Sequence, residues 1–148
     1  MASNRGFWKI MLALAAGGVA LVALVIAFRP VARTGAVAFA QSNLRTAADA
    51  AERAADSEGS LSVATRQRLS DDPALDDLLL IDPDQASNDS EIVSVLATNE
   101  AWTAAARADT GECFWIRLDA SGNRSFGTGT DCSADEAGLA APGGWPEP

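Results

Sequence analysis

Histidine and tyrosine are absent from this chain of 148 residues, and its only lysine is Lys9. Without histidine the chain cannot form a Ser-His or Cys-His nucleophile pair or an imidazole metal site. Lys9 borders a long apolar run, so it cannot serve a Ser-Lys dyad in a distal domain. Gly127 and Gly129 have no helix behind them and do not form a phosphate cradle. These absences favour a protein that is not an enzyme and holds no cofactor and no metal.

Acidic residues are missing from the first 48 positions, and all 20 of them lie beyond. Only arginine opposes them there, so the distal part is strongly acidic and would repel a phosphate backbone. We therefore expect no nucleic acid partner. The cluster Asp71, Asp72, Asp76 and Asp77 formally permits carboxylate catalysis, but such a cluster is more often a solvated face.

Residues 10–28 form an unbroken apolar run. As a helix this run is roughly 28 Å long, about the thickness of a bilayer's hydrocarbon core. We expect a transmembrane helix over 10–28, preceded by a cytoplasmic leader and flank over 1–9. Small residues in it would let other helices approach closely; they are Ala13, Ala16, Gly17, Ala20, Ala23 and Ala27. The alternative is that alanine and glycine are simply common in membrane spans.

A cleaved signal peptide is the other interpretation of this N-terminus. Ala38-Phe39-Ala40 has the small-x-small form of a cleavage site. However, the apolar run is longer than a usual signal core, and it is followed by Arg29 and Arg33 where a short cleavage region is expected. These features favour a retained anchor, with the lipid bilayer as a partner.

Cys113 and Cys132 are the only cysteines. An even pair in a small, membrane-tethered domain favours a disulfide and an oxidising, non-cytoplasmic compartment. Two free thiols are the alternative. Basic residues flank the apolar run equally, so they do not set its orientation. The cysteines favour a single-pass protein of the cell membrane with a cytoplasmic N-terminus and an extracellular C-terminal domain.

An amphipathic helix is expected over 30–58, because apolar residues recur there at intervals of three and four. Pro30 would kink or end the preceding helix, and Gly59 is the expected stop. The apolar stripe is narrow and rich in alanine, which suits close packing against a sheet or another helix; it comprises Val37, Ala40, Leu44, Ala47 or Ala48, Ala51 and Ala55.

Residues 59–90 are expected to be a variable acidic loop region. It contains a candidate short helix over 61–69 and a helix cap at Asp72-Pro73. The polar segment 82–91 offers side-chain oxygens that a calcium ion would accept. It lacks the EF-hand spacing and turn glycine, however, so a solvated loop is favoured.

Short apolar runs separated by mostly glycine-containing turns predict an antiparallel four-strand meander within 91–133. Phe114, Ile116 and Leu118 would share the face that packs on the helix. A disulfide would tie this third strand to the segment just past the fourth. Residues 134–148 are expected to be a flexible, extended tail in which Trp145 is incidental. The fold class is thus α+β, with the long N-terminal transmembrane and amphipathic helix packed on a small sheet.

This layout resembles that of type IV pilins and type II secretion pseudopilins. Arg5-Gly6-Phe7 resembles the prepilin peptidase site, where cleavage after Gly6 would leave Phe7 as the new N-terminus. Residues 40–55 are similar to the second half of a pilin helix. Residues 102–132 are similar to the sheet and disulfide of pilin-like proteins from high-GC Gram-positive bacteria. The resemblance implies prepilin peptidase and other pilin-like subunits as partners.

One position departs from the family pattern. Pilins carry a glutamate four residues after the cleavage-site aromatic, and this chain has Met11 there. In the family, that glutamate neutralises a neighbour's terminal ammonium inside an apolar filament core, where an unpaired charge is costly. Three interpretations fit Met11 and the nearby Lys9: a minor or tip pilin, an unprocessed pilin-like protein, or a similar domain on an unrelated anchor.

Two functions of different classes follow. The first is a non-enzymatic structural or assembly protein of a type IV pilus or type II secretion-like system. The second is a single-pass, membrane-anchored extracytoplasmic binding or accessory domain that does not polymerise. The Arg5-Gly6-Phe7 triplet and the length of the helix favour the first, and Lys9 and Met11 favour the second.

Overall fold

The computed structural model describes residues 34–145. The chain divides into the units Met1–Thr34 and Gly35–Pro148, and the fold described here is that of the second. The leader, the expected transmembrane helix, the Gly6-Phe7 processing site and the small packing residues of that helix lie outside the described residues. Between residues 34 and 145, no helix has the length and hydropathy needed to cross a membrane.

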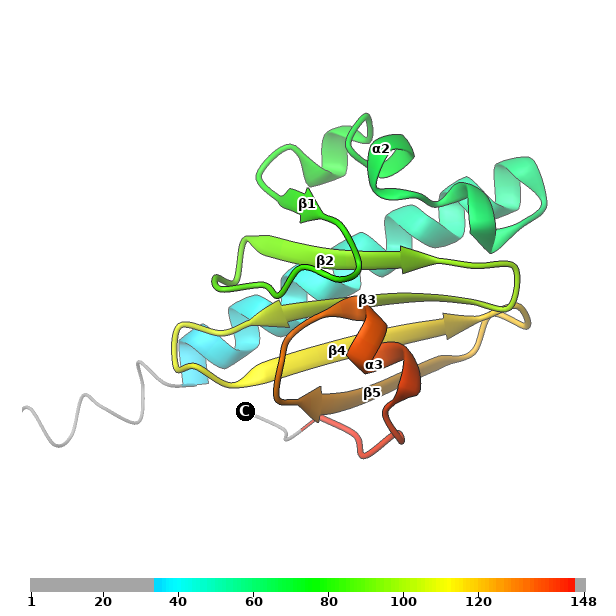
Figure 1. Cartoon of the computed structure of the whole chain (residues 1–148). Coiled ribbons are helices and arrows are strands. Elements are labelled where there is room, and N and C mark those ends of the chain that lie inside the picture. Colours follow the sequence, from blue (N-terminus) through cyan, green and yellow to red (C-terminus); the bar gives the residue numbers. More distant parts are fainter. Residues whose placement is uncertain (1–33, 146–148) are drawn as a thin grey trace, which may run out of the picture. The chain divides into compact units, whose positions relative to one another are not determined.

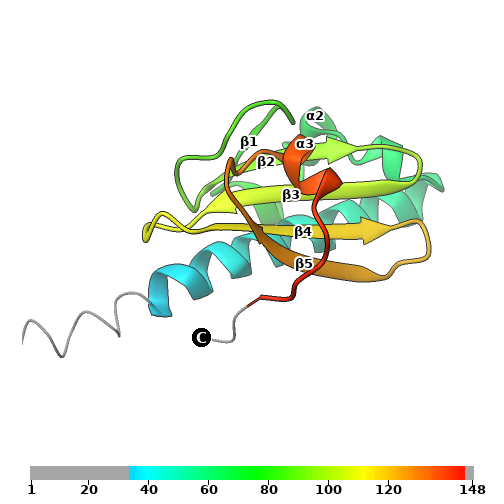
Figure 2. The ribbon, with the colours of Figure 1, turned by 60° about the horizontal axis from the view of Figure 1, so that its bottom comes forward.

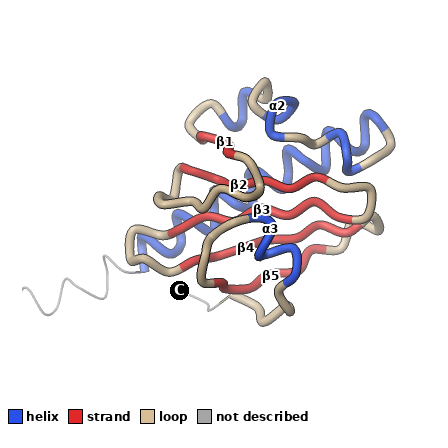
Figure 3. Tube along the Cα trace, viewed as in Figure 1, coloured by secondary structure: helices blue, strands red, loops and turns tan. Residues whose placement is uncertain are grey.

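The described fold is α+β and contains a five-stranded mixed sheet in the order β1-β2-β3-β4-β5 (Figures 1 and 3). Strand β1 runs parallel to β2, and the other neighbours are antiparallel. The expected meander is confirmed for the last four strands, whereas the parallel edge strand was not expected. The bounds are β1 Leu79–Ile81, β2 Ile92–Ala97, β3 Ala101–Arg107, β4 Cys113–Asp119 and β5 Arg124–Gly129.

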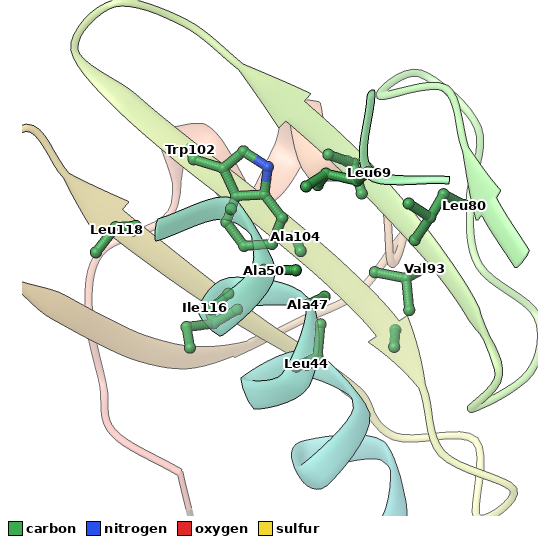
Figure 4. Packing of buried hydrophobic residues seen from close by; sticks show 14 of the residues in the cluster. Leu44, Ala47, Ala50, Leu69, Leu80, Val93, Trp102, Ala104, Ile116 and Leu118 are labelled. Carbon is green, nitrogen blue, oxygen red and sulfur yellow. The ribbon is translucent and has the colours of Figure 1, made fainter. Parts of the chain in front are cut away.

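A helix over residues 34–58 crosses one face of the sheet (Figures 1 and 2). Its apolar stripe is buried as expected, with Val37 and Ala55 only partly covered; the fully buried members are Ala40, Leu44, Ala47, Ala48 and Ala51. Alanine lets the helix approach the sheet closely, so the bulk of the core comes from the sheet side. Trp102, Ile116 and Leu118 supply much of that bulk (Figure 4).

Phe114, Ile116 and Leu118 are buried in the same cluster as the helix stripe, which confirms the predicted inner face of β4. Trp102 is fully buried beside them, and its indole nitrogen donates to the carbonyl oxygen of Ala64 at 3.0 Å. That bond satisfies the polar end of the ring inside an apolar core. It also fixes the connection that follows the long helix against the sheet.

The connection from the long helix to β1 consists of short capped turns. Gly59 has φ +82°, a conformation that favours glycine, and it ends the long helix. Side-chain oxygens of Ser60, Thr65 and Asp72 then accept from backbone N–H groups at the starts of three short helices. These are η1 Leu61–Val63, α2 Arg66–Leu69 and η2 Pro73–Leu75.

The expectation of an extended tail after residue 133 is wrong for residues 134–139, which form a helix, whereas residues 140–145 lie in no helix or strand. Helix α3, Ala134–Leu139, lies on the sheet face opposite the long helix (Figures 1 and 2). The buried hydroxyl of Ser94 accepts from the backbone N–H of Ala134 at 2.9 Å and donates to the carbonyl oxygen of Asp82 at 3.1 Å. One serine therefore joins β2, the loop after β1 and the start of α3.

Candidate assembly surface

The disulfide is the expected site feature that falls within the described residues. Cys113 and Cys132 are bonded, with their Cα atoms 5.3 Å apart and a sequence separation of 19 residues. The bond joins the start of β4 to the segment just past β5, as the sequence predicted. It therefore holds the segment between β5 and α3 to the start of β4.

The amino-terminal turns of the long helix carry apolar surface that the sheet does not cover. Full burial begins at Ala40, while Thr34 and Gly35 are exposed and residues 36–38 are partly exposed. Phe39 retains 49% of its surface exposure. An exposed phenylalanine next to further apolar residues marks a surface suited to contact with another apolar partner.

The arginines of the described residues are engaged within the domain. Arg53, Arg66 and Arg68 make exposed ion pairs, at 2.9 Å to Asp72, 3.0 Å to Asp82 and 3.2 Å to Glu58. Arg124 bridges β5 to the long helix through Asp49 and Glu52. Arg45, Arg107 and Arg117 contact an aromatic ring or backbone carbonyls. The surface that remains is dominated by carboxylates.

Hydrogen bonds lower the pKa of three carboxylates. The pKa of Asp119 is lowered chiefly by the Asn123 side chain, and that of Glu136 chiefly by the Thr130 hydroxyl. The pKa of Asp72 is lowered first by the backbone N–H of Ala74 and then by Arg53. A lowered native pKa means that each group stabilises the fold above its unfolded pKa. This contribution is lost as the pH falls through the lowered value.

The pKa of Arg124 is raised, although burial alone would lower it. Partial burial acts to lower its pKa, but hydrogen bonds and charge attraction from Asp49 and Glu52 outweigh burial and raise it. The guanidinium therefore stays charged while it ties β5 to the helix. This bridge closes the side of the core where the long helix meets the sheet edge.

Arg117 fixes α3 on the outer face of the sheet. Its Nη2 atom donates to the carbonyl oxygens of Ala137 at 2.6 Å, Gly138 at 2.5 Å and Ala140 at 3.2 Å. These carbonyls lie at the end of α3, where the last acceptors of a helix lose their regular partners; that of Ala137 also accepts from the backbone N–H of Ala140 at 3.3 Å. The guanidinium also lies 5.4 Å from the ring centre of Trp115. Arg117 therefore caps the carboxyl end of α3 and holds this helix against β4.

Replacing Arg117 by methionine keeps an apolar stem but removes the guanidinium donor from three partly buried carbonyls, of which only that of Ala137 keeps a backbone donor. We expect Arg117→Met to lower the free energy of unfolding by about 2 kcal/mol. Arg66→Met is the matched control, because its ion pair with Asp82 is exposed and should change stability by less than about 0.5 kcal/mol. Urea unfolding followed by circular dichroism measures both. Equal losses in the two variants would contradict a special role for Arg117.

Two open hollows lie at opposite faces of the domain. One, of about 360 Å³, is lined by Glu52, Asp56 and Asp119 near the carboxyl end of the long helix. The other, of about 590 Å³, lies beside α3 and is lined in part by Arg117 and Leu139. In the described part of the chain, no group of three or more histidines, cysteines and carboxylates could hold a metal ion. Asp82, from the segment weighed for calcium, pairs with Arg66.

Trp145 is the residue whose role the sequence analysis missed. Its indole nitrogen donates to the carbonyl oxygens of Trp115 at 2.9 Å and Gly127 at 3.1 Å. Its ring centre lies 4.6 Å from that of Phe126, and the guanidinium of Arg45 lies 4.7 Å above it. Trp145 is therefore partly buried and packs against the core cluster, and the only sequence signal was that a large aromatic stood among glycines and prolines.

The chain matches no protein-family model, no curated protein and no solved structure.

Proposed function

We propose that this chain is a pilin-like structural protein, anchored in the cell membrane by residues 10–28 and displaying its C-terminal domain outside the cell. In this role the chain performs no catalysis and needs no cofactor. Its partners are the bilayer, the apolar helices of other pilin-like subunits and prepilin peptidase. The apolar run would carry assembly through its small residues, and the domain would present the acidic surface and turns.

The observation that carries this proposal is the long helix over residues 34–58. It follows the apolar run closely in sequence, and its alanine stripe is buried against an antiparallel meander from Ala40 onward. Its first turns expose Phe39 and partly expose their apolar neighbours. A helix that is embedded at one end and apolar at the other is suited to joining a folded domain to packed helices.

The disulfide supports the extracellular side of the proposal. A bond between two buried cysteines persists in an oxidising compartment and is rare in the cytoplasm. The acidic surface is compatible with a domain that faces solvent and avoids nucleic acid.

Mass spectrometry of the protein extracted from native membranes tests processing. We expect a mature chain that begins at Phe7, because the Arg5-Gly6-Phe7 triplet resembles the prepilin peptidase site. A Gly6→Val variant serves as the control and should retain its first six residues. An intact N-terminus in the unaltered protein would remove processing from the proposal, and cleavage after Ala40 would remove the anchor as well.

A membrane-anchored binding or accessory domain is the second candidate. Met11 favours it, because pilins carry a glutamate at this position. Lys9 also favours it, because it adds a second positive charge nearby. Shearing intact cells separates the two candidates. Recovery of the protein in the sheared surface fraction supports a filament subunit, whereas retention with the membrane in a processed chain supports the anchored domain.

A further inference from the structure

The C-terminal segment passes from one face of the sheet to the other around the edge formed by β5. Helix α3 lies on the outer face, and the chain after Leu139 runs past β5 toward the long helix (Figure 2). The backbone N–H groups of Gly143 and Gly144 donate to the carbonyl oxygen of Phe126 at 3.1 and 3.0 Å. The segment is therefore hydrogen-bonded to the last strand of the sheet.

A second edge acceptor of β5 is also satisfied from within the domain. The indole nitrogen of Trp115 donates to the carbonyl oxygen of Thr128 at 3.2 Å. Thr128 and Phe126 are two residues apart, so their carbonyls point to the same side of the strand. These two acceptors on the outer side of β5 are thus occupied and are not open to pairing with another strand.

The seat of Trp145 is built entirely from groups outside the C-terminal segment. The carbonyl oxygens of Trp115 and Gly127 converge on a single N–H donor. Phe126 and the edge of Phe114 form the apolar wall, with ring centres 4.6 and 6.4 Å from that of Trp145. Arg45 covers the ring from the long helix. This combination recognises an indole through its shape, its N–H and its π face.

The segment that delivers Trp145 is exposed to solvent apart from its hydrogen bonds to the carbonyl oxygen of Phe126. Residues 141–144 are exposed, and Trp145 is the partly buried member of the segment. Gly144 has φ +74°, which allows the sharp turn that directs the ring inward. Most of the contact free energy of the segment is therefore concentrated in one aromatic side chain, as in a peptide ligand with a single anchor.

We propose that the surface formed by Arg45, Phe114, Phe126 and the carbonyl oxygens of Trp115 and Gly127 is a binding site for an extended, glycine-containing peptide that carries a tryptophan. In the folded monomer the chain's own residues 141–145 fill this site. When that segment is removed, the site accepts the same segment supplied by a second copy of the chain. The site is independent of the proposed pilin-like role and involves neither processing nor the membrane anchor.

The test uses a shortened chain, residues 1–140, purified in detergent. The probe is a synthetic peptide that spans residues 141–148. We expect the peptide to bind with a dissociation constant on the order of 0.1–1 mM and to raise the melting temperature. The control peptide carries alanine in place of Trp145. It should bind about 30-fold more weakly or not at all, the usual effect of truncating an anchor aromatic.

A second variant keeps the proposal testable if the shortened chain does not fold. Full-length Trp145→Ala retains the segment and its glycine hydrogen bonds but empties the seat, and N-acetyl-tryptophanamide serves as the probe. Saturable binding, with chemical-shift changes at the Phe126 and Gly127 amides, supports the site. If both folded variants give no binding, or binding that the alanine peptide matches, the proposal is overturned.

Discussion

Gly127→Ala is expected to lower the free energy of unfolding by about 3 kcal/mol, because the sheet has no room for a methyl group at this position. An added Cβ atom would lie 2.3 Å from Cζ2 and 2.5 Å from Cε2 of Trp115. Trp115 is fully buried, and its ring crosses over Gly127 to reach the carbonyl oxygen of Thr128. The ring cannot move without losing that hydrogen bond and its packing against α3.

Gly129→Ala is the matched control on the same strand and the same face. A Cβ atom there would meet Glu136, Trp115 and Cys113 at 3.6 to 3.8 Å, which is ordinary van der Waals contact. We expect a change of less than about 1 kcal/mol for this variant. Urea denaturation with near-ultraviolet circular dichroism reports both stability and the environment of Trp115. A similar loss of stability in both variants would show that β5 needs glycine for its backbone conformation, and not to make room for the indole of Trp115.

Removing the disulfide by the double substitution Cys113→Ala and Cys132→Ala is expected to cost about 3 kcal/mol. The bond closes a loop with a sequence separation of 19 residues, and cross-linking such a loop restricts the unfolded chain by about this amount. Both cysteines are buried, so alanine avoids placing a polar group in their space. Thermal and urea unfolding of the oxidised protein and the double variant measure the difference.

Reduction of the unaltered protein is the control for this prediction. If cross-linking is the cause, the reduced protein and the double variant should unfold at similar denaturant concentrations. A double variant as stable as the oxidised protein would contradict a stabilising bridge. It would also weaken the inference that the domain matures in an oxidising compartment.

The parts of the fold that could be predicted from the sequence are those in which one local pattern decides the structure. The alanine stripe repeats at helical spacing, and its burial from Ala40 to Ala51 follows from that period. In the last four strands, apolar and polar residues alternate or the strand is bounded by turn residues. Short connections then place these strands side by side in chain order. The disulfide follows from there being two cysteines in one small domain.

Other parts depend on contacts between segments that are far apart in sequence. Strand β1 has three residues, and its parallel pairing with β2 leaves no sequence period that distinguishes it from a buried turn. Helix α3 is six residues long and is held by Arg117 from β4 rather than by its own propensity. Trp145 gains its role from carbonyls on two strands, which no local pattern indicates.

The candidate functional residues also fall into those that the sequence predicts and those that only the folded structure brings together. Gly6, Phe7 and the small residues of the apolar run can be proposed from the sequence alone, because each depends on a local motif or spacing. The clearance at Gly127 and the seat of Trp145 are properties of the assembled sheet. They depend on where the indoles of Trp115 and Trp145 lie against β5, which contacts between distant segments decide.

The commitment of the arginines to internal contacts has a consequence for crowded assemblies of this domain. In the described residues, the arginines bind groups of their own domain on the helix, the sheet edge and α3. The surfaces of two neighbouring domains would therefore face each other with an excess of negative charge. Mutual repulsion of this kind reaches only about one Debye length. The ionic strength of the surroundings would therefore govern how closely neighbouring domains can be brought together.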